Sequence, residues 1–151
     1  MQSYPLYRAL RSDKLRLAAL EATLDAYARE SARDEVPVHR LIAASSQEIE
    51  ERAQAFLQRL RLAKVNDDLQ LETVKGESAI GGGSAPTSRL PTMLISLTHR
   101  RLTPNQIEAA LRHSDPPVIA RIVDDRVLLD LRTVLPNEEL DLERAVLSFS
   151  S

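Results

Sequence analysis

The stretch that decides the fold is residues 115–134, DPPVIARIVDDRVLLDLRTV. Two runs of mainly apolar residues, Val118–Val123 and Arg126–Arg132, have the length and composition of strands. Asp124 and Asp125 lie between the two runs, and Asp tolerates the positive φ that a two-residue turn requires. These residues therefore predict an antiparallel hairpin.

The register of this hairpin places apolar side chains on one face and charged side chains on the other. A two-residue turn sets three apolar pairs across the strands: Ile122 with Val127, Ala120 with Leu129, and Val118 with Leu131. This apolar face must belong to the core. The opposite face collects charged side chains, and Arg121 lies diagonal to Asp130: Arg121, Arg126, Asp130 and Arg132. Such a face is either a solvated ladder of ion pairs, which contributes little stability, or the wall of an active-site cleft.

Regular elements also precede and follow the hairpin. A period of two over Leu69–Val74 and the short apolar run Met93–Thr98 predict two further strands. The glycine-rich loop Gly76–Pro86 separates them. Helices are predicted near residues 13–29, 37–44, 46–60, 104–111 and 142–149, with capping signals at Ser45 and Thr103. This order predicts an α+β fold, a small mixed or antiparallel sheet covered by helices on one face. We expect a compact chain with an N-terminal part, 1–30, and an α+β small domain, 31–151.

The N-terminal segment concentrates side chains that bind anions. Arg8 and Arg11 lie three residues apart, ahead of a helix predicted from about Asp13 to Arg29 with Ser12 as its N-cap. Residues at this spacing on a helix point the same way, and arginine binds carboxylate or phosphate through two parallel hydrogen bonds. From spacing alone, however, two solvated surface arginines are the better interpretation. An apolar stripe on the helix is expected to be buried: Leu17, Leu20, Leu24 and Tyr27.

Composition excludes several classes of protein. The 151 residues carry 20 basic and 22 acidic side chains, so no basic excess indicates nucleic-acid binding. The absence of cysteine excludes disulfides, thiol catalysis and zinc–thiolate sites, and favours a reducing compartment. The three histidines lie far apart, without metal-ligand spacing. No apolar run reaches the ~20 residues of a membrane-spanning helix. We therefore expect a cytoplasmic protein with no metal site and no membrane segment.

Three segments, taken in order, resemble the C-terminal portion of bacterial selenocysteine synthase, also called L-seryl-tRNA(Sec) selenium transferase. They are PLYRALRSDKLRLAALEATL at 5–24, GESAIGGGSAP at 76–86 followed by LP at 90–91, and the hairpin stretch at 115–134. That family consists of fold-type-I enzymes that use pyridoxal 5'-phosphate (PLP) to replace the hydroxyl of tRNA-bound serine with selenium. The resemblance implies PLP as cofactor, seryl-tRNA(Sec) and selenophosphate as partners, and a homo-oligomer when full length. It also implies the C-terminal small-domain fold of those enzymes.

The resemblance also implies roles for individual residues. Arg8 and Arg11 match the two arginines of the family's RALR segment, which are thought to bind the anionic selenium donor or a phosphate. Arg132 is a weaker candidate, because many fold-type-I enzymes hold a substrate carboxylate with a small-domain arginine, whereas here the carboxylate is esterified to tRNA. The loop Gly81-Gly82-Gly83 is another weaker candidate, chiefly as a lining that permits close approach of the backbone.

One departure from the family decides what to expect of this chain alone. The Schiff-base lysine of the family lies upstream of the RALR segment, in a glycine-rich stretch. The lysines of this chain are Lys14, Lys64 and Lys75, and none of them lies in such a stretch. We therefore expect this chain to be a piece of a longer enzyme. We expect it to contain no catalytic residue and to be inactive alone. Two alternatives stay open. One is a free-standing non-catalytic binding or regulatory module, and the other is the small domain of a related PLP enzyme that acts on a small amino acid.

Overall fold

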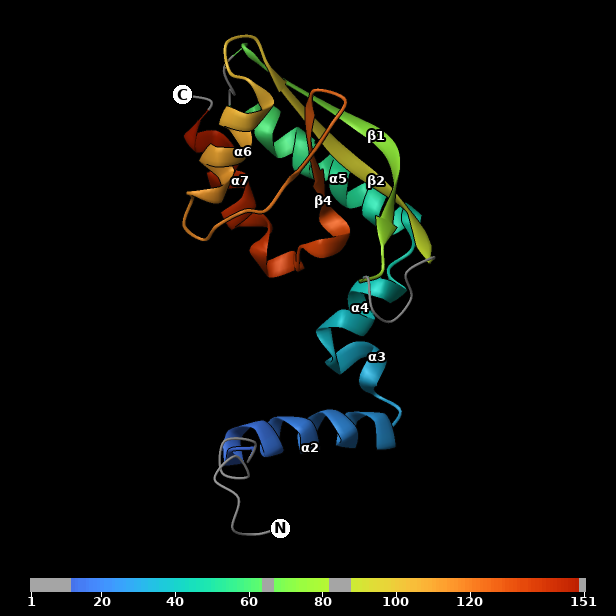
Figure 1. Ribbon diagram of the computed structural model, residues 1–151. Coiled ribbons are helices and arrows are strands. Elements are labelled where there is room, and N and C mark those ends of the chain that lie inside the picture. The colour runs from blue at the N-terminus through green and yellow to red at the C-terminus, as the bar shows by residue number, and fades with distance from the viewer. Residues whose placement is uncertain (1–11, 64–66, 82–87, 150–151) are drawn as a thin grey trace. The chain divides into compact units, whose positions relative to one another are not determined.

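The computed structural model confirms the α+β class and describes residues 12–63, 67–81 and 88–149 (Figure 1). The chain divides into two compact units, Met1–Ala43 and Ala44–Ser151. The boundary expected at residue 30 falls inside the first unit, between two of its helices. Along the described ranges, no helix is long and apolar enough to cross a membrane.

The described residues of the second unit form a four-stranded sheet in the order β1-β2-β4-β3, and every neighbouring pair is antiparallel. The strands are β1 (Leu69–Ala79), β2 (Arg89–His99), β3 (Arg121–Val123) and β4 (Arg126–Asp130). Leu69 pairs with His99 at one end of the long β1–β2 ladder and Ala79 with Arg89 at the other. Residues 76–79, predicted as part of the glycine-rich loop, therefore belong to β1, where they pair with β2, and the residues between Ala79 and Arg89 connect the two strands of a long hairpin.

Helices cover one face of this sheet and supply most of the buried apolar side chains of the core. They are α5 (Ser46–Leu62), α6 (Pro104–Arg112) and α7 (Glu139–Ser148), and two short 3-10 turns, η1 (Leu131–Thr133) and η2 (Pro136–Glu138), join β4 to α7. Figure 1 shows α5 running along β1 and β2. Phe56 and Leu60 of α5 are fully buried with Ile95 of β2 and Val127 of β4. Alternation along the strands then places the even-numbered residues of β2 and β4 on the opposite face, which we call the outer face.

Two predicted helix starts are confirmed. Ser45 and Glu48 form the expected capping box, with Glu48 N donating to Ser45 Oγ at 3.1 Å and Ser45 N to Glu48 Oε2 at 2.6 Å. Thr103 caps α6, whose first residue is Pro104. These signals involve residues three apart, and short-range hydrogen bonds of this kind form with little help from the rest of the fold.

The hairpin is confirmed at its turn and corrected at both ends. Ile122 pairs with Val127, and Asp124 and Asp125 have φ of 49° and 58°. The first strand is shorter than predicted, because the amide of Val118 bonds to Leu111 O at the end of α6.

The second strand ends at Asp130 instead of reaching Arg132. The carboxylate of Asp130 accepts a hydrogen bond from the amide of Arg132 and so caps the 3-10 turn η1. The expected pairs of Ala120 with Leu129 and of Val118 with Leu131 are therefore wrong. Val118 and Ala120 still pack partly buried against the core, but Ile122 is 41% exposed, so the expectation that this whole apolar face is core is also wrong.

The first unit contains three helices in its described part: α2 (Lys14–Ala28), α3 (Ala32–Glu35) and α4 (Pro37–Ala43). Asp13 caps α2 by accepting from Arg16 N at 2.8 Å, so Ser12 is not the cap. The expectation of a buried stripe on α2 is also wrong. Within α2, Ala26 alone is buried. The stripe residues are exposed to 54% at Leu17, 55% at Leu20, 58% at Leu24 and 51% at Tyr27.

Candidate functional site

Most of the predicted site residues cannot be placed in the fold. Arg8, Arg11, Gly82 and Gly83 lie outside the described residues. Gly81 is described: it lies two residues after the end of β1, is exposed, and would have no atom within 4 Å of an added Cβ. Packing among the described residues therefore does not require a glycine at position 81.

Arg132 lies inside the fold, away from the charged face of the hairpin. Arg132 is 4% exposed. The guanidinium donates from Nη1 to Ala44 O, just before α5, and from Nη2 to Pro91 O of β2 at 2.8 Å. Because η1 turns the chain after Asp130, Arg132 leaves the row of charges that strand alternation predicted. Arg132 thus links η1 to β2 and to the start of α5 through two backbone carbonyls. The guanidinium nitrogens that make these bonds are not available to a substrate.

Asp130 is the centre of a hydrogen-bonded cluster that lies where β1, β2 and β4 meet. Its carboxylate accepts from Ser78 Oγ at 2.6 Å, from Thr92 Oγ at 3.0 Å and from the backbone amide of Arg132 at 3.1 Å. The side chain of Asp130 is 8% exposed. A carboxylate with three donors at such distances is held in one orientation. Sequence reasoning missed Ser78 and Thr92, although Ser78 lies in the segment 76–86 quoted above, because strand register alone brings the two hydroxyls to Asp130.

Arg121 extends this cluster to the surface. Its Nη2 lies 3.9 Å from Asp130 Oδ2, and its side chain is 49% exposed. The predicted diagonal between Arg121 and Asp130 is therefore confirmed, although the distance is that of an ion pair and exceeds hydrogen-bond range. In the part of the chain that the structure describes, Asp130 is the one ion-pair partner of Arg121. Arg126, by contrast, forms a salt bridge with Glu72 of β1.

Two open hollows on the outer face of the sheet adjoin Arg121. The smaller, of about 260 Å³, includes Ser78, Ile119 and Asp130 in its lining. The larger, of about 570 Å³, carries Lys75 and Arg126 against Glu77 and Asp124. Its charges nearly balance, so the face as a whole attracts neither anions nor cations strongly. Arg121 and Lys75 are the side chains here with donors available to an anionic group. Among the described residues, no cluster of three or more His, Asp or Glu side chains could hold a metal ion.

A different ion-pair network ties α5 to α7 and has a structural role. Arg52 Nε donates to Glu139 at 2.8 Å, and Arg59 donates to Glu139 at 2.8 Å and to Glu143 at 3.0 Å. Burial acts to lower the pKa of Arg59, but the hydrogen bonds to Glu139 and Glu143 outweigh it and raise that pKa. These arginines are committed to carboxylates of the same chain, so they do not belong to the candidate site.

Comparisons with known proteins agree on one family. The family model for L-seryl-tRNA selenium transferase (SelA) matches residues 1–135. The L-seryl-tRNA(Sec) selenium transferase of Geobacter sulfurreducens is 43% identical over 139 residues, which cover 91% of this chain and 30% of that protein. Its counterpart in Moorella thermoacetica is 40% identical over 147 residues, 97% of this chain and 31% of that protein. The chain thus spans about 30% of the length of these relatives.

Proposed function

The chain belongs to the L-seryl-tRNA selenium transferase family, and from that membership we propose that it forms the C-terminal part of such an enzyme. The proposed reaction converts seryl-tRNA(Sec) to selenocysteinyl-tRNA(Sec) with selenophosphate. The observation that carries the proposal is the match itself, which extends over residues 1–135 and includes both Arg8 and Arg11. We also expect the full-length enzyme to be a homo-oligomer.

The described residues do not fit PLP, the cofactor that the resemblance implies. PLP enzymes bind the cofactor through a lysine amine in an enclosed pocket. Lys14 is exposed on the first turn of α2, and Lys75 is exposed on β1 at the edge of the sheet. We therefore propose that the region of the enzyme beyond this chain holds the cofactor, and that the 151-residue chain alone has no transferase activity.

Arg8 and Arg11 are proposed to bind the anionic selenium donor. They precede α2, which begins at Lys14. The carboxylate of Asp13 already caps this helix start by accepting from Arg16 N, so an added anion would be held by the arginine side chains themselves, with the positive charge of Lys14 nearby. An anion held by two arginines is fixed in position and orientation, which is the contribution that a transfer to a second bound reactant requires.

The experiment uses a chimera in which this chain replaces the matching C-terminal portion of the Geobacter sulfurreducens transferase. Selenophosphate affinity is measured by calorimetry for Arg8→Ala, Arg11→Ala and the control Arg16→Ala. Arg16 is exposed, and its ion pair is with Asp13 on the same helix turn. Hydrogen bonds to charged groups contribute roughly 1.5–3 kcal/mol, so each of the first two variants should weaken binding by about 10- to 100-fold. Unchanged affinity in both would refute the assigned role.

The closed core of unit Ala44–Ser151 favours a second candidate function. A domain that buries its own apolar residues can persist without the rest of an enzyme, so the chain could act as a non-catalytic binding or regulatory module. This candidate predicts that the chimera has no transferase activity while the 151-residue chain is stable and monodisperse. Transferase activity of the chimera above that of its truncated Geobacter part would rule it out.

A further inference from the structure

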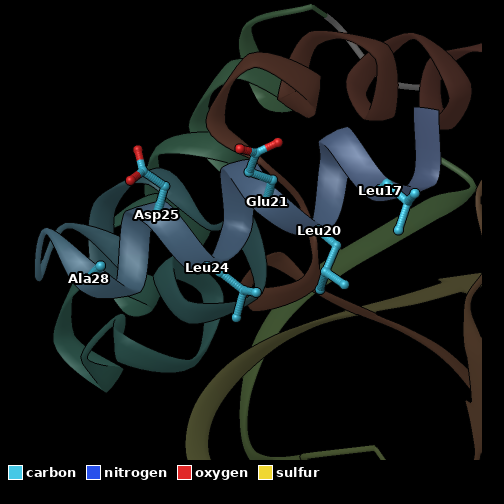
Figure 2. A pocket seen from close by; sticks show the side chains of 6 residues that line it. All are labelled: Leu17, Leu20, Glu21, Leu24, Asp25 and Ala28. Atoms are coloured by element: carbon cyan, nitrogen blue, oxygen red, sulfur yellow. The ribbon is translucent and has the colours of Figure 1, made fainter. Parts of the chain in front are cut away.

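Helix α2 carries an apolar stripe that is exposed. We define the α2 stripe as Leu17, Leu20, Leu24 and Ala28, with Glu21 and Asp25 along one edge, the residues that line a shallow hollow on the helix. Figure 2 shows the three leucines pointing to one side of α2, while the two carboxylates point to the other side of the stripe. Each of these leucines is more than half exposed.

Helix α2 is poorly supported by its own unit. Every residue from Ser12 to Asp25 is exposed. The contacts that hold the helix lie at its last turn, where Tyr27 bonds to His39 and Arg29 bonds to Glu35 at 3.0 and 2.9 Å. An isolated helix of this length is marginally stable in water, and packing of an apolar face supplies most of the stability that helices have in proteins. The stripe is the face through which α2 can gain that stability.

Charge and area argue against a second copy of this chain as the occupant. The stripe runs from Leu17 to Ala28, so two α2 helices packed antiparallel about a two-fold axis at its centre would bring Glu21 of each copy close to Asp25 of the other, and like charges repel. Three leucines and an alanine also fall well short of the ~1,200 Å² that a stable dimer buries. A surface that small suffices when a covalent connection supplies a high effective concentration.

The length of the relatives indicates such an occupant. The chain matches the C-terminal portion of enzymes of which it spans about 30%. In those enzymes the larger part precedes the segment that corresponds to residues 1–13, and α2 is the first described element after that segment. We propose that the α2 stripe docks on this larger part of the selenium transferase, on an apolar surface that carries a basic side chain opposite Glu21. Asp25 is already paired with Arg29 at 3.2 Å. This proposal rests on the proposed function, because it assigns the larger part of the same enzyme as the partner.

Amide hydrogen exchange tests the proposal in the chimera described above. The amides from Leu17 to Ala28 should exchange at least about 100-fold more slowly in the chimera than in the 151-residue chain, as expected for a helix that gains tertiary packing. The double variant Leu20→Ser and Leu24→Ser should lose that protection. Leu15→Ser is the matched control, because Leu15 is 83% exposed and lies on the opposite side of α2. It should keep the protection.

Each other outcome counts against the docking. Unchanged exchange in α2, in a chimera whose Ile95 amide in β2 stays protected, would overturn it. So would slow exchange in the 151-residue chain that depends on its concentration, because the occupant would then be a second copy. If β2 is unprotected in the chimera, the same measurement on the full-length Geobacter enzyme, over its segment aligned with residues 14–28, decides the question.

Transferase activity separates this proposal from the proposed function. An active chimera with an unprotected α2 would refute the docking and support the function. A protected α2 in an inactive chimera would support the docking and count against the function. A separate variant tests the proposed contact of Glu21 with a basic side chain. Glu21→Lys should reduce the exchange protection of the α2 amides in the chimera by about tenfold and leave the protection of the β2 amides unchanged.

Discussion

Replacing Asp130 by alanine should destabilise the second unit strongly. The substitution leaves three donors without their acceptor: the hydroxyls of Ser78 and Thr92 and the amide of Arg132. Ser78 and Thr92 are each 5% exposed, so water does not readily replace the carboxylate. Hydrogen bonds to charged groups contribute roughly 1.5–3 kcal/mol each. Because the three share one acceptor, and burying the charge itself is unfavourable, we expect a loss of about 3–4 kcal/mol in the free energy of unfolding.

The measurement must report on the second unit alone. The chain has no tryptophan, and its three tyrosines, at positions 4, 7 and 27, lie in the first unit, so intrinsic fluorescence is unsuitable. Exchange of the β2 amides of Ile95 and Leu97 gives the free energy of opening directly. Asp130→Asn keeps one acceptor oxygen and should lose about half as much as Asp130→Ala. The control Asp124→Asn lies in the exposed turn at a φ of 49°, which asparagine tolerates, and should change stability by less than about 0.5 kcal/mol. A loss below about 1 kcal/mol for Asp130→Ala would refute the reasoning.

Three further predictions concern packing and charge. Arg132→Lys keeps the charge but lacks the planar fork that reaches two backbone carbonyls, so β2 exchange should report a loss of about 2 kcal/mol, and wild-type protection would contradict this. At Gly76 an added Cβ would overlap the side chain of Leu94, so Gly76→Ala should shift the Leu94 methyl resonances and destabilise the sheet by about 1 kcal/mol; unshifted methyls with wild-type stability would show that position 76 does not contact Leu94. Hydrogen bonds from Arg29 lower the pKa of Glu35 below its ordinary value of 4.5, so this pair stabilises the first unit above that pH and the contribution is lost as the pH falls through the lowered pKa. An NMR titration midpoint of Glu35 at or above 4.5, or no upward shift in Arg29→Gln, would show that the pair does not form in solution.

The parts of the fold that could be predicted are those set by short stretches of chain. The capping residues Ser45 and Thr103 and the turn at Asp124 and Asp125 depend on hydrogen bonds or dihedral angles within about four residues. The α+β class followed from the change between periods of 3.6 and 2 along the chain. Where a local alternative existed, prediction failed: Asp13 and Ser12 are both good caps, and the contact with Arg16 N distinguishes them.

The site was less accessible to prediction than the fold. Asp130 and Arg121 could be paired from the hairpin register, but Ser78 is 52 residues from Asp130 and Thr92 is 38 residues away. Nothing in the residue types selects these two hydroxyls among the others. Arg8 and Arg11 remain predictions carried by the resemblance and by the family match that covers them.

The sequence by itself determined the helix starts at Ser45 and Thr103, the hairpin turn and membership of the family, because each is written in neighbouring residues or in the order of segments along the chain. Only the tertiary structure decided where Arg132 and the α2 stripe lie. Arg132 turns inward because carbonyls 41 and 88 residues away are within reach of its guanidinium. The stripe is exposed because amphipathic spacing specifies that a face is apolar, whereas burial also requires a second surface to pack against it.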